Sequence, residues 1–508
     1  MKLVKELAAL VRGAVIKGDK ETKVTGMEHD SRKVAHGTMF VCIPGAHVDG
    51  HDFIPQAEEA GAKAILTTRE DIEPPFGGAV LVVPDLQEAL DIMVPFFHDY
   101  PARSMRVIGI TGTNGKTTTS YVTRAILRAA GYKVGLIGTI QIMMEDEVFP
   151  IHNTTPDVVE LQHTLAIMRD RGLDYVVMEV SSHALDQNRV AGIEFDTVVF
   201  TNLTQDHLDY HKTLENYKLA KAKLFDLVSA PGVKERKCAV VNIDDEAGAT
   251  MLEHAKCPHI TYAIDREADL RALDVEVEAS GTHVLLENQK FCNEKFCKMP
   301  LRLHLAGRFN VYNVMSAVGA ALAENIEPSI IQKVLESFTA VSGRFELVRT
   351  GNEKQDFSII VDYAHTPDGV ENVLKTARQI AKAKIISVFG CGGDRDRTKR
   401  PIMGRLAAEL SDVVIATSDN PRTEDPEFIL SQVEEGVREK IGSKHHEKIV
   451  DRKTAIYRAV ELAEKDDIVV ILGKGHEDYQ ILKDKTIHFD DKEVARAAVA
   501  AKFAEEEH

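Results

Sequence analysis

The sequence lacks any apolar run long enough to cross a membrane. It also contains no tryptophan, and only 6% of its 508 residues are aromatic. Because a membrane-spanning helix needs about 20 consecutive apolar residues, we expect no membrane insertion. The opening stretch, MKLVKELAALVRG, predicts the start of an amphipathic helix with polar breaks and does not have the pattern of a signal peptide.

Cysteine is scarce as well, with six residues scattered along the chain. The closest pair is Cys292 and Cys297, in FCNEKFC, but a zinc site needs two further ligands and none is evident nearby. Scattered cysteines are typical of reduced thiols inside the cell. We therefore expect free thiols in a cytoplasmic protein.

Positive charge is in deficit, because 79 acidic residues face 62 lysines and arginines and leave a net charge of −17. Such a balance disfavours binding along a nucleic-acid backbone, so we expect no nucleic-acid partner. A local basic pocket for a small anion remains compatible with it.

The length of the chain predicts about three domains, since 508 residues exceed a single hydrophobic core. Apolar runs that alternate with helical segments predict an α/β fold in three blocks, residues 1–103, 104–340 and 341–508. The central block combines a parallel sheet with a small β-rich part. The expected strands lie within residues 37–45, 62–68, 77–85, 105–111, 133–140, 174–182, 195–203, 237–244, 273–289 (a hairpin), 358–365, 384–393, 412–420 and 467–475.

A phosphate-binding loop is predicted by GITGTNGKTTTS, which begins at Gly109 between an expected strand and an expected helix. Consecutive backbone N–H groups and a helix N-terminus favour a phosphate. Lys116 adds a point charge for the outer phosphates, and Thr117 offers a hydroxyl to Mg²⁺. The strict loop pattern would require glycine at position 110, where Ile110 stands. The alternative is a glycine-rich turn that caps an ordinary helix.

Later strand ends differ from those of motor and transport ATPases. Glu179 lies in MEVSSHAL and His207 in FTNLTQDHLDYH, and together they could ligate a divalent cation. Taken alone, His207 is interpreted as a surface or hydrogen-bonded histidine. The stretch YKLAKAKLF, taken alone, predicts an amphipathic helix with solvated lysines.

A family resemblance becomes visible when the motifs are taken in order. The chain resembles the Mur ligase family, which builds the peptide stem of the bacterial cell wall by ATP-driven amide formation. The resemblance implies a UDP-binding domain over 1–103, an ATPase domain over 104–340 and a Rossmann-like domain over 341–508. The motifs that carry it are GTNGKTT, MEVSSHALDQNRV, TNLTQDHLDYH, YKLAKAKLF, LAGRFNVYN, SGRFE and VDYAHTPD.

The resemblance also implies how the catalytic residues act. Lys116 and Thr117 would hold the phosphates of ATP and a first Mg²⁺, while Glu179 and His207 would bind a second. Lys221, in YKLAK, would carry a carbamate derived from CO₂, which turns a cation into an anion that can lie near Mg²⁺. ATP would phosphorylate a substrate carboxylate, and an amine would then displace the phosphate.

Further residues are assigned by the same resemblance. The ATP-binding set comprises Gly112, Thr113, Asn114, Gly115, Lys116, Thr117, Thr118, Asn310, Asn313, Arg344, Asp362, Tyr363 and His365. The set for the UDP-linked substrate comprises Ser31, Ala46, His47, Val48, Asn153, Thr154, Thr155, Ser181, Gln187 and Arg189.

The third block indicates which amino acid is added. DNPR, Asp419 to Arg422, resembles the signature of the family member that adds meso-2,6-diaminopimelate to UDP-N-acetylmuramoyl-L-alanyl-D-glutamate. Diaminopimelate has one carboxylate more than lysine, and a guanidinium is its natural partner. The expected diaminopimelate site comprises Arg395, Asp419, Asn420, Pro421, Arg422, Gly473 and Glu477.

Several alternatives stay open at this point. DNPR taken alone predicts a proline turn with a surface arginine, and a lysine-adding ligase is the nearest rival function. A folylpolyglutamate synthase on the same scaffold, a nucleotide-binding scaffold without catalysis and a phosphate-loop kinase are further rivals. Apart from its small-molecule substrates we expect no partner, and we expect a monomer.

Overall fold

The computed structural model describes residues 1–45, 48–151, 153–278, 281–290 and 297–505. The chain divides into two compact units, and each is described by itself. Unit one comprises Met1–Gly109, Tyr132–Thr197 and Asp226–Lys237, and unit two comprises Ile110–Gly131, Val198–Phe225 and Cys238–His508.

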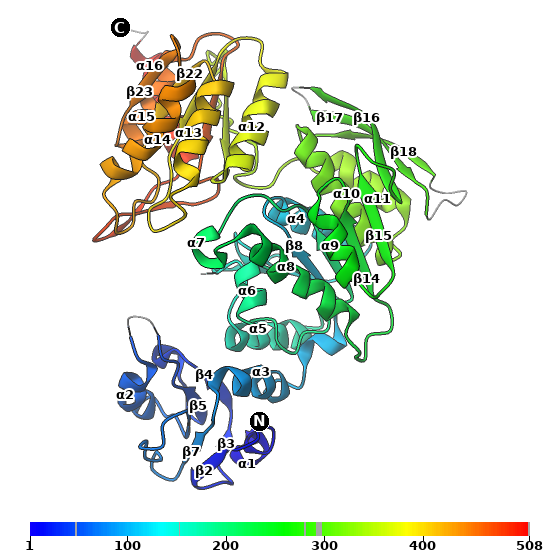
Figure 1. Cartoon of the computed structure of the whole chain (residues 1–508), viewed down its shortest axis with the longest axis vertical. Helices are drawn as coiled ribbons and strands as arrows, with labels where there is room; N and C mark the ends of the chain where they lie inside the picture. Colours follow the sequence, from blue (N-terminus) through cyan, green and yellow to red (C-terminus); the bar gives the residue numbers. More distant parts are fainter. Residues whose placement is uncertain (46–47, 152, 279–280, 291–296, 506–508) are drawn as a thin grey trace. The chain divides into compact units, whose positions relative to one another are not determined.

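The N-terminal part of unit one is a five-stranded sheet in the order β2-β7-β6-β5-β4 (Figure 1). Strands β4 to β7 are parallel, and β2 is antiparallel to β7. The side chains of β5, β6 and β7 are buried throughout, as expected of parallel strands covered on both faces. The elements are β1 (Lys2–Leu3), α1 (Val4–Ala8), β2 (Val15–Gly18), β3 (Lys23–Val24), β4 (Gly26–Glu28), β5 (Thr38–Val41), α2 (Ile54–Glu59), β6 (Ala64–Thr67), β7 (Ala79–Val82) and α3 (Leu86–Phe97).

The remainder of unit one is built on β9, which pairs in parallel with β12 and antiparallel with β10. Asp157 caps the helix α5 by accepting from the backbone N–H groups of Val159 and Glu160. The elements are β9 (Val134–Ile137), β10 (Ile142–Met144), β11 (Glu147–Phe149), α5 (Val158–Asp170), β12 (Tyr175–Glu179) and α6 (Ser182–Asp186); β8 (Arg106–Thr111) and β13 (Thr197–Phe200) have residues in both units.

Unit two begins with the phosphate loop and a mixed sheet. β14 pairs in parallel with β15, whereas β16, β17 and β18 are antiparallel, which confirms the small β-rich part. The elements are α4 (Lys116–Ala129), α7 (Leu208–His211), α8 (Leu214–Ser229, whose last residues belong to unit one), β14 (Cys238–Asn242), α9 (Ala247–His254), β15 (His259–Ala263), β16 (Leu270–Glu278), β17 (Gly281–Asn288), β18 (Lys298–Leu303), α10 (Arg308–Ala323) and α11 (Pro328–Ser337).

The C-terminal part of unit two is a six-stranded sheet in the order β19-β20-β24-β21-β22-β23, parallel except for β19. Alternate residues of β24 face opposite layers: Val470 packs with α12, α13 and α14, and Val469 packs with α15 and α16. The elements are β19 (Glu346–Leu347), β20 (Ser358–Asp362), α12 (Pro367–Ile380), β21 (Ile385–Phe389), α13 (Lys399–Leu410), β22 (Val413–Ala416), α14 (Pro426–Lys440), β23 (His445–Lys448), α15 (Arg452–Leu462), β24 (Ile468–Leu472), β25 (Tyr479–Ile481), β26 (Thr486–His488) and α16 (Asp491–Glu505).

These sheets confirm the α/β fold class, and every strand expected from the sequence is present. The polar loops after β20, β21, β22 and β24 leave the carboxyl ends of neighbouring parallel strands, where open α/β sheets bind ligands.

The helix start expected at the N-terminus is confirmed as the short α1, which follows the two residues of β1. The expectation of reduced thiols is wrong for Cys297, which is disulfide-bonded, whereas Cys42, Cys238, Cys257 and Cys391 form no disulfide.

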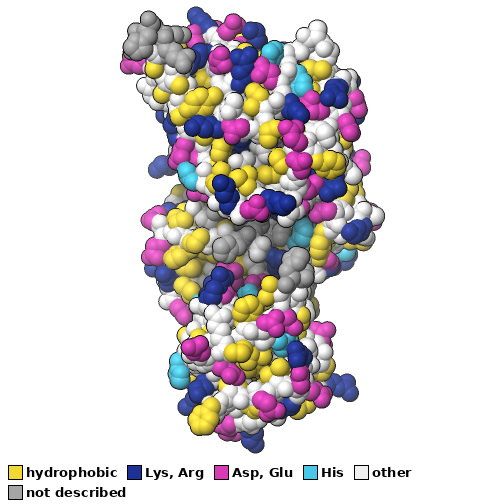
Figure 2. All heavy atoms as spheres, turned by 90° about the vertical axis from the view of Figure 1, so that its left-hand side faces the viewer, with side chains coloured by type: hydrophobic (Ala, Val, Ile, Leu, Met, Phe, Trp, Pro, Cys, Tyr) yellow, Lys and Arg dark blue, Asp and Glu magenta, His cyan; other side chains and the backbone are white. Residues whose placement is uncertain are grey.

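The surface carries charges of both signs. On the face drawn in Figure 2, acidic and basic side chains are intermingled with smaller groups of hydrophobic ones. None of the helices in the described part of the chain combines the length and the apolar character that a bilayer crossing requires.

Candidate active site

The phosphate loop lies between β8 and the N-terminus of α4. Gly115 is the N-cap of α4 with φ 87°, and a Cβ there would lie 2.2 Å from Asn313 Oδ1. Gly112 has φ 150°, and a Cβ there would lie 1.8 Å from Thr201 Oγ1. Both positions therefore require glycine, for backbone conformation and for space.

Replacing Gly115 with alanine is expected to weaken ATP binding about 10- to 100-fold, because the methyl group must displace Asn313 or the loop. Isothermal titration with ATP measures this. Gly131→Ala is the matched control, because Gly131 also has a positive φ (93°) at the other end of α4 but has nothing within 4 Å of a new Cβ. Equal ATP affinity in Gly115→Ala and the wild type would contradict the assignment of this loop.

Two lysines meet at this loop. Lys116 Nζ and Lys221 Nζ both donate to the carbonyl of Gly112, at 2.9 and 2.8 Å. Lys221 is 1% exposed, and its Nζ lies 4.4 Å from the centre of the Tyr217 ring. Burial lowers the pKa of Lys221 well below its usual value, and the charge of Lys116 lowers it further. Lys221 is therefore not the solvated helix residue that YKLAKAKLF alone predicts.

A cavity of about 340 Å³ lies next to the loop, within unit two. Its lining includes nine residues predicted for ATP, namely Asn114, Gly115, Thr117, Thr118, Asn313, Arg344, Asp362, Tyr363 and His365. Asn310 does not line it but accepts from Asn313 Nδ2 at 3.1 Å and so orients that amide. Lining residues that the sequence analysis missed include Asp244, Asp245, Arg308, Phe309, Tyr312, Asp368 and Asn372.

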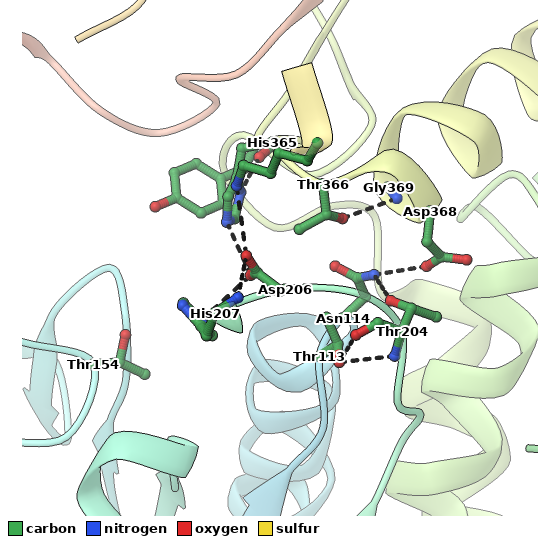
Figure 3. Close-up of polar contacts among 12 residues, drawn as sticks. Thr113, Asn114, Thr154, Thr204, Asp206, His207, His365, Thr366, Asp368 and Gly369 are labelled. Carbon is green, nitrogen blue, oxygen red and sulfur yellow. Dashed lines mark hydrogen bonds and ion pairs between the residues drawn. The ribbon is translucent and has the colours of Figure 1, made fainter. Parts of the chain in front are cut away.

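The C-terminal part of unit two contributes directly to this cavity. Arg344 Nη2 donates to Thr117 Oγ1 at 3.0 Å, and its guanidinium lies 4.6 Å from the centre of the Tyr363 ring. Asp368 Oδ2 accepts from Asn114 Nδ2 at 2.6 Å (Figure 3). The tip of the phosphate loop and the helix α12 are thus held together.

Asp206 is a buried anion that the sequence analysis missed. Figure 3 shows it between His207 and His365, whose Nε2 atoms lie 3.3 and 3.9 Å from Asp206 Oδ2. Lys399 Nζ, which is also buried, lies 3.5 Å from Asp206 Oδ1. Burial raises the pKa of Asp206, but Lys399 and the two histidines outweigh this and hold it below its usual range. His207 itself has φ 55° at the N-cap of α7.

In unit one, the predicted carboxylate is part of a hydroxyl cluster. Glu179 is fully buried at the end of β12 and accepts from the N–H and the hydroxyl of Thr139, at 3.0 and 2.9 Å. Thr139 Oγ1 lies 3.1 Å from Thr154 Oγ1. Thr139 was not predicted as a site residue, although it lies at the end of a predicted strand.

Other residues predicted for the UDP-linked substrate meet close by. Thr155 Oγ1 accepts from the N–H of Ser181 at 3.0 Å, and Ser181 is the N-cap of α6. Arg189 donates from Nη1 to the carbonyl of Thr155 and from Nε and Nη2 to Gln187 Oε1. Six of the predicted residues thus lie around the C-terminal end of β12.

The remaining predicted residues of this set are more scattered. Ser31 Oγ donates to Gln56 Oε1 at 2.8 Å, in the N-terminal part of unit one. Val48 and Asn153 are exposed. Ala46 and His47 lie outside the described residues.

The side chains of Arg395 and Arg422 both lie beside Gly392, in the loop after β21. A Cβ on Gly392 would lie 2.8 Å from Arg422 Nη1 and 3.8 Å from Arg395 Cγ. Burial lowers the pKa of Arg422, and Arg395 lowers it further. Within the described ranges neither arginine makes an ion pair; Arg422 donates to the carbonyl of Gly393 and Arg395 to that of Asp394. Two arginines whose charges interact, and which have no carboxylate partner among the described residues, could bind an anion.

The opposite wall of this site is acidic. Asn420 Nδ2 donates to Glu477 Oε2 at 2.9 Å, and the fully buried Lys474 donates to Asn420 Oδ1 and Glu477 Oε2. Burial and then Asp419 raise the pKa of Glu477. Gly473 has φ 116°, and a Cβ there would lie 3.5 Å from Asp419 Oδ2. Lys474 was missed, although it lies in the predicted loop after β24.

Comparison with known proteins identifies the family of this chain. Residues 23–100 match a profile described as Mur ligase family, catalytic domain, residues 110–321 match Mur ligase middle domain, and residues 343–475 match Mur ligase, glutamate ligase domain. The chain belongs to the Mur ligase family.

Relatives of this Mur ligase match over almost its whole length. A UDP-N-acetylmuramoyl-L-alanyl-D-glutamate–2,6-diaminopimelate ligase of Clostridium botulinum is 46% identical, over 94% of this chain and 95% of the relative. The protein of the same name from Bacillus cereus is 45% identical, over 96% of each chain.

Solved structures share the fold of this Mur ligase. A structure of a UDP-N-acetylmuramoyl-L-alanyl-D-glutamate–2,6-diaminopimelate ligase is 31% identical, covers 99% of each chain and superposes with a TM-score of 0.66. The MurF ligase of Thermotoga maritima, solved in complex with ADP, is 18% identical with a TM-score of 0.64, over 96% of this chain and 98% of that one. At that identity the second likeness concerns the fold alone.

Proposed function

We propose that this chain is the ATP-dependent ligase that adds meso-2,6-diaminopimelate to UDP-N-acetylmuramoyl-L-alanyl-D-glutamate. The observation that carries the proposal is that the side chains of Arg395 and Arg422 both lie beside Gly392, where neither pairs with a carboxylate in the described part of the chain. Diaminopimelate has the additional carboxylate that such a pair would bind. The relatives at 46% and 45% identity carry this activity in their names.

The chemistry joins a carboxylate to an amine in two steps. An oxygen of the D-glutamyl side-chain carboxylate attacks the γ-phosphorus of ATP, the bond from that phosphorus to the bridging oxygen breaks, and ADP leaves. The amine of diaminopimelate then attacks the acyl carbon, loses a proton and expels inorganic phosphate as the amide forms. Charge accumulates around the phosphoryl group, so positioning and electrostatics dominate the rate.

The residues of unit two have complementary roles in the first step. The N-terminus of α4 and Lys116 would hold the phosphates of ATP. Arg344, which donates a hydrogen bond to Thr117, would contact the nucleotide from the C-terminal part of the unit. Asn313, oriented by Asn310, would contact the adenine side.

Magnesium fits the donors that the chain offers. The described residues contain no group of three or more His, Cys, Asp and Glu side chains that could hold a metal, so a site here needs other donors. The hydroxyl of Thr117 would serve a first ion, and Glu179, His207 and a carbamate on Lys221 would serve a second. Bound Mg²⁺ would neutralise charge on the phosphoryl oxygens.

The carbamate proposal follows from the surroundings of Lys221. CO₂ adds only to a neutral amine, and burial beside Lys116 lowers the pKa of Lys221 toward that form. Carbamylation would then place a negative charge on Lys221 next to the positive charge of Lys116, which favours the pair.

The UDP-linked substrate would bind to residues of unit one. Thr154, Thr155, Ser181 and Gln187 offer hydroxyl and amide groups for its carbonyls and sugar hydroxyls, and Arg189 offers a guanidinium for a carboxylate. Ser31, Ala46, His47, Val48 and Asn153 complete this proposed set. In the diaminopimelate site, Asn420, the Gly473 backbone and Glu477 would orient the ammonium group at the far centre. Asp419 and Pro421 complete this proposed set.

The organisation and location of the protein are also proposals. We assign domain boundaries at 1–103, 104–340 and 341–508 and expect a cytoplasmic monomer. Light scattering on the purified protein measures the oligomeric state directly.

A substrate-dependence assay tests the proposed function. Release of ADP and phosphate should require ATP, the UDP-muramoyl dipeptide and diaminopimelate together. Equal or better turnover with L-lysine would show the lysine-adding version instead. Absence of turnover with either amino acid would indicate a scaffold without catalysis.

A further inference from the structure

The two arginine-bearing loops of the C-terminal part are joined by a buried ion pair. Arg400, at the start of α13, is 0% exposed, and its Nη1 and Nη2 donate to the two carboxylate oxygens of Glu424 at 3.1 and 2.8 Å. The same guanidinium donates to the carbonyl of Gly392 at 3.2 Å and to Gln432 Oε1 at 2.7 Å. Hydrogen bonds from Arg400 are the largest of several effects that lower the pKa of Glu424.

Glu424 in turn holds the opposite loop. Its Oε1 accepts from the N–H of Asp394, the residue before Arg395, at 2.6 Å. Glu424 itself lies two residues after Arg422 in the other loop. One carboxylate thus joins the backbone beside the first arginine to the loop that carries the second. We call this arrangement the Arg400–Glu424 clamp.

Additional bonds run in parallel with the clamp. Thr423 donates from its N–H and its hydroxyl to the carboxylate of Asp394, at 3.1 and 2.7 Å. The N–H of Gly393 donates to the carbonyl of Asn420 at 2.9 Å. The two loops therefore behave as one rigid piece.

We propose that the Arg400–Glu424 clamp determines amino-acid specificity by fixing the separation of the guanidinium groups of Arg395 and Arg422. The inference rests on the function proposed above, in which these two arginines bind the second carboxylate of diaminopimelate. Arg400 and Glu424 are positioning residues, because they act through the two loops and not on the substrate.

The energetics of buried ion pairs support a role in geometry. Removing two charges from water offsets most of their mutual attraction, so such a pair adds little net stability compared with apolar side chains. A bidentate pair does fix the relative position of the groups that carry it. A displacement of about 1 Å in a binding group can cost on the order of 100-fold in rate.

Glu424→Gln tests the proposal, because it keeps the shape of the side chain and removes its charge. We expect kcat/KM for diaminopimelate to fall about 10- to 100-fold, mainly through KM, with the KM for ATP within about twofold of the wild type. Turnover of L-lysine should not change, since lysine lacks the carboxylate in question. The ratio of kcat/KM for diaminopimelate to kcat/KM for L-lysine should therefore fall about 10- to 100-fold. Simple destabilisation of the fold lowers both values equally and does not change this ratio.

Glu434→Gln is the matched control. The side chain of Glu434 is 8% exposed against 9% for Glu424, and its carboxylate accepts from His446 Nε2 at 2.7 Å, away from both loops. This control should keep the ratio of the wild type. A second variant, Thr423→Val, removes one parallel bond from an exposed position and should lower the ratio about threefold.

The outcomes separate the inference from the proposed function. Wild-type enzyme that does not use diaminopimelate overturns the proposed function. Wild-type discrimination that persists unchanged in both Glu424→Gln and Thr423→Val overturns the clamp alone. If Glu424→Gln does not fold, the ratio measured for Thr423→Val decides.

Discussion

Replacing Lys221 with alanine is expected to lower kcat roughly 10²- to 10³-fold, the loss typical for one preorganised electrostatic group in an active site. The amine of Lys221 is buried beside Lys116, and burial lowers its pKa, so it is poised to accept CO₂. Without the carbamate, the second metal site would lose one of its two proposed anionic ligands, the other being Glu179. Lys116 would also lose the negative charge that the carbamate would place beside it.

Chemical rescue gives this prediction its specificity. Acetate or formate should restore part of the activity of Lys221→Ala, because a small carboxylate can occupy the space of the missing carbamate. Lys223→Ala, at an exposed position of the same helix α8, should retain wild-type kcat. Near-normal activity of Lys221→Ala without added carboxylate would rule out the role proposed for this lysine.

Replacing Arg422 with alanine should lower kcat/KM for diaminopimelate about 10²- to 10³-fold, the cost of truncating one partner of a desolvated charge pair. The wild type should prefer diaminopimelate over L-lysine by about 10⁴-fold, since lysine would leave the two guanidinium groups unpaired. In Arg422→Ala this preference should shrink, because lysine does not use the arginine. Steady-state kinetics with both amino acids measure both quantities.

Arg405→Ala provides the control for Arg422. Arg405 lies on α13 with 43% of its side chain exposed and pairs with Glu439 away from the two loops. Its loss should leave both kcat/KM values within about twofold of the wild type. Arg422→Ala that keeps full discrimination would show that the second carboxylate is bound elsewhere.

The sequence predicts the sheets well because their strands are buried on both faces. β5, β20, β21 and β24 are predominantly apolar and almost entirely buried, which is the pattern of parallel strands between two helical layers. β23 escaped prediction because it is an edge strand of sequence HHEK, with exposed and half-buried polar side chains. The short 3-10 helix at Pro101–Ser104 was not predicted, because its four residues have no apolar period.

The candidate site is predictable only where its chemistry is local. Gly115, Lys116 and Thr117 form a contiguous motif, and the structure places Gly115 and Thr117 at the lining of the nucleotide cavity. The ion pair of Asp206 and Lys399 is missed because the two residues are far apart in the sequence. Asp206 lies inside TNLTQDHLDYH, which the sequence analysis quotes, so a rule that every charged residue in such a loop is a candidate would have found it.

Buried charges give the largest error of interpretation. Lys221 is 1% exposed, although YKLAKAKLF alone predicts solvated lysines. Arg400 and Lys474, which the sequence analysis did not single out, have no exposed side-chain surface. A charged side chain is buried only where partners satisfy it, and those partners come from distant segments such as Glu424 and Asn420. The periodicity of a segment describes only that segment and cannot identify partners from distant segments.

Transfer of an oxygen atom from substrate to phosphate tests the central claim most directly. UDP-N-acetylmuramoyl-L-alanyl-D-glutamate labelled with ¹⁸O in the D-glutamyl side-chain carboxylate is incubated with the enzyme, ATP, Mg²⁺ and diaminopimelate. If the carboxylate is phosphorylated before the amide forms, each released phosphate should contain one oxygen from that carboxylate, visible by mass spectrometry. Release of phosphate without the label, while the tripeptide product accumulates, would contradict the account.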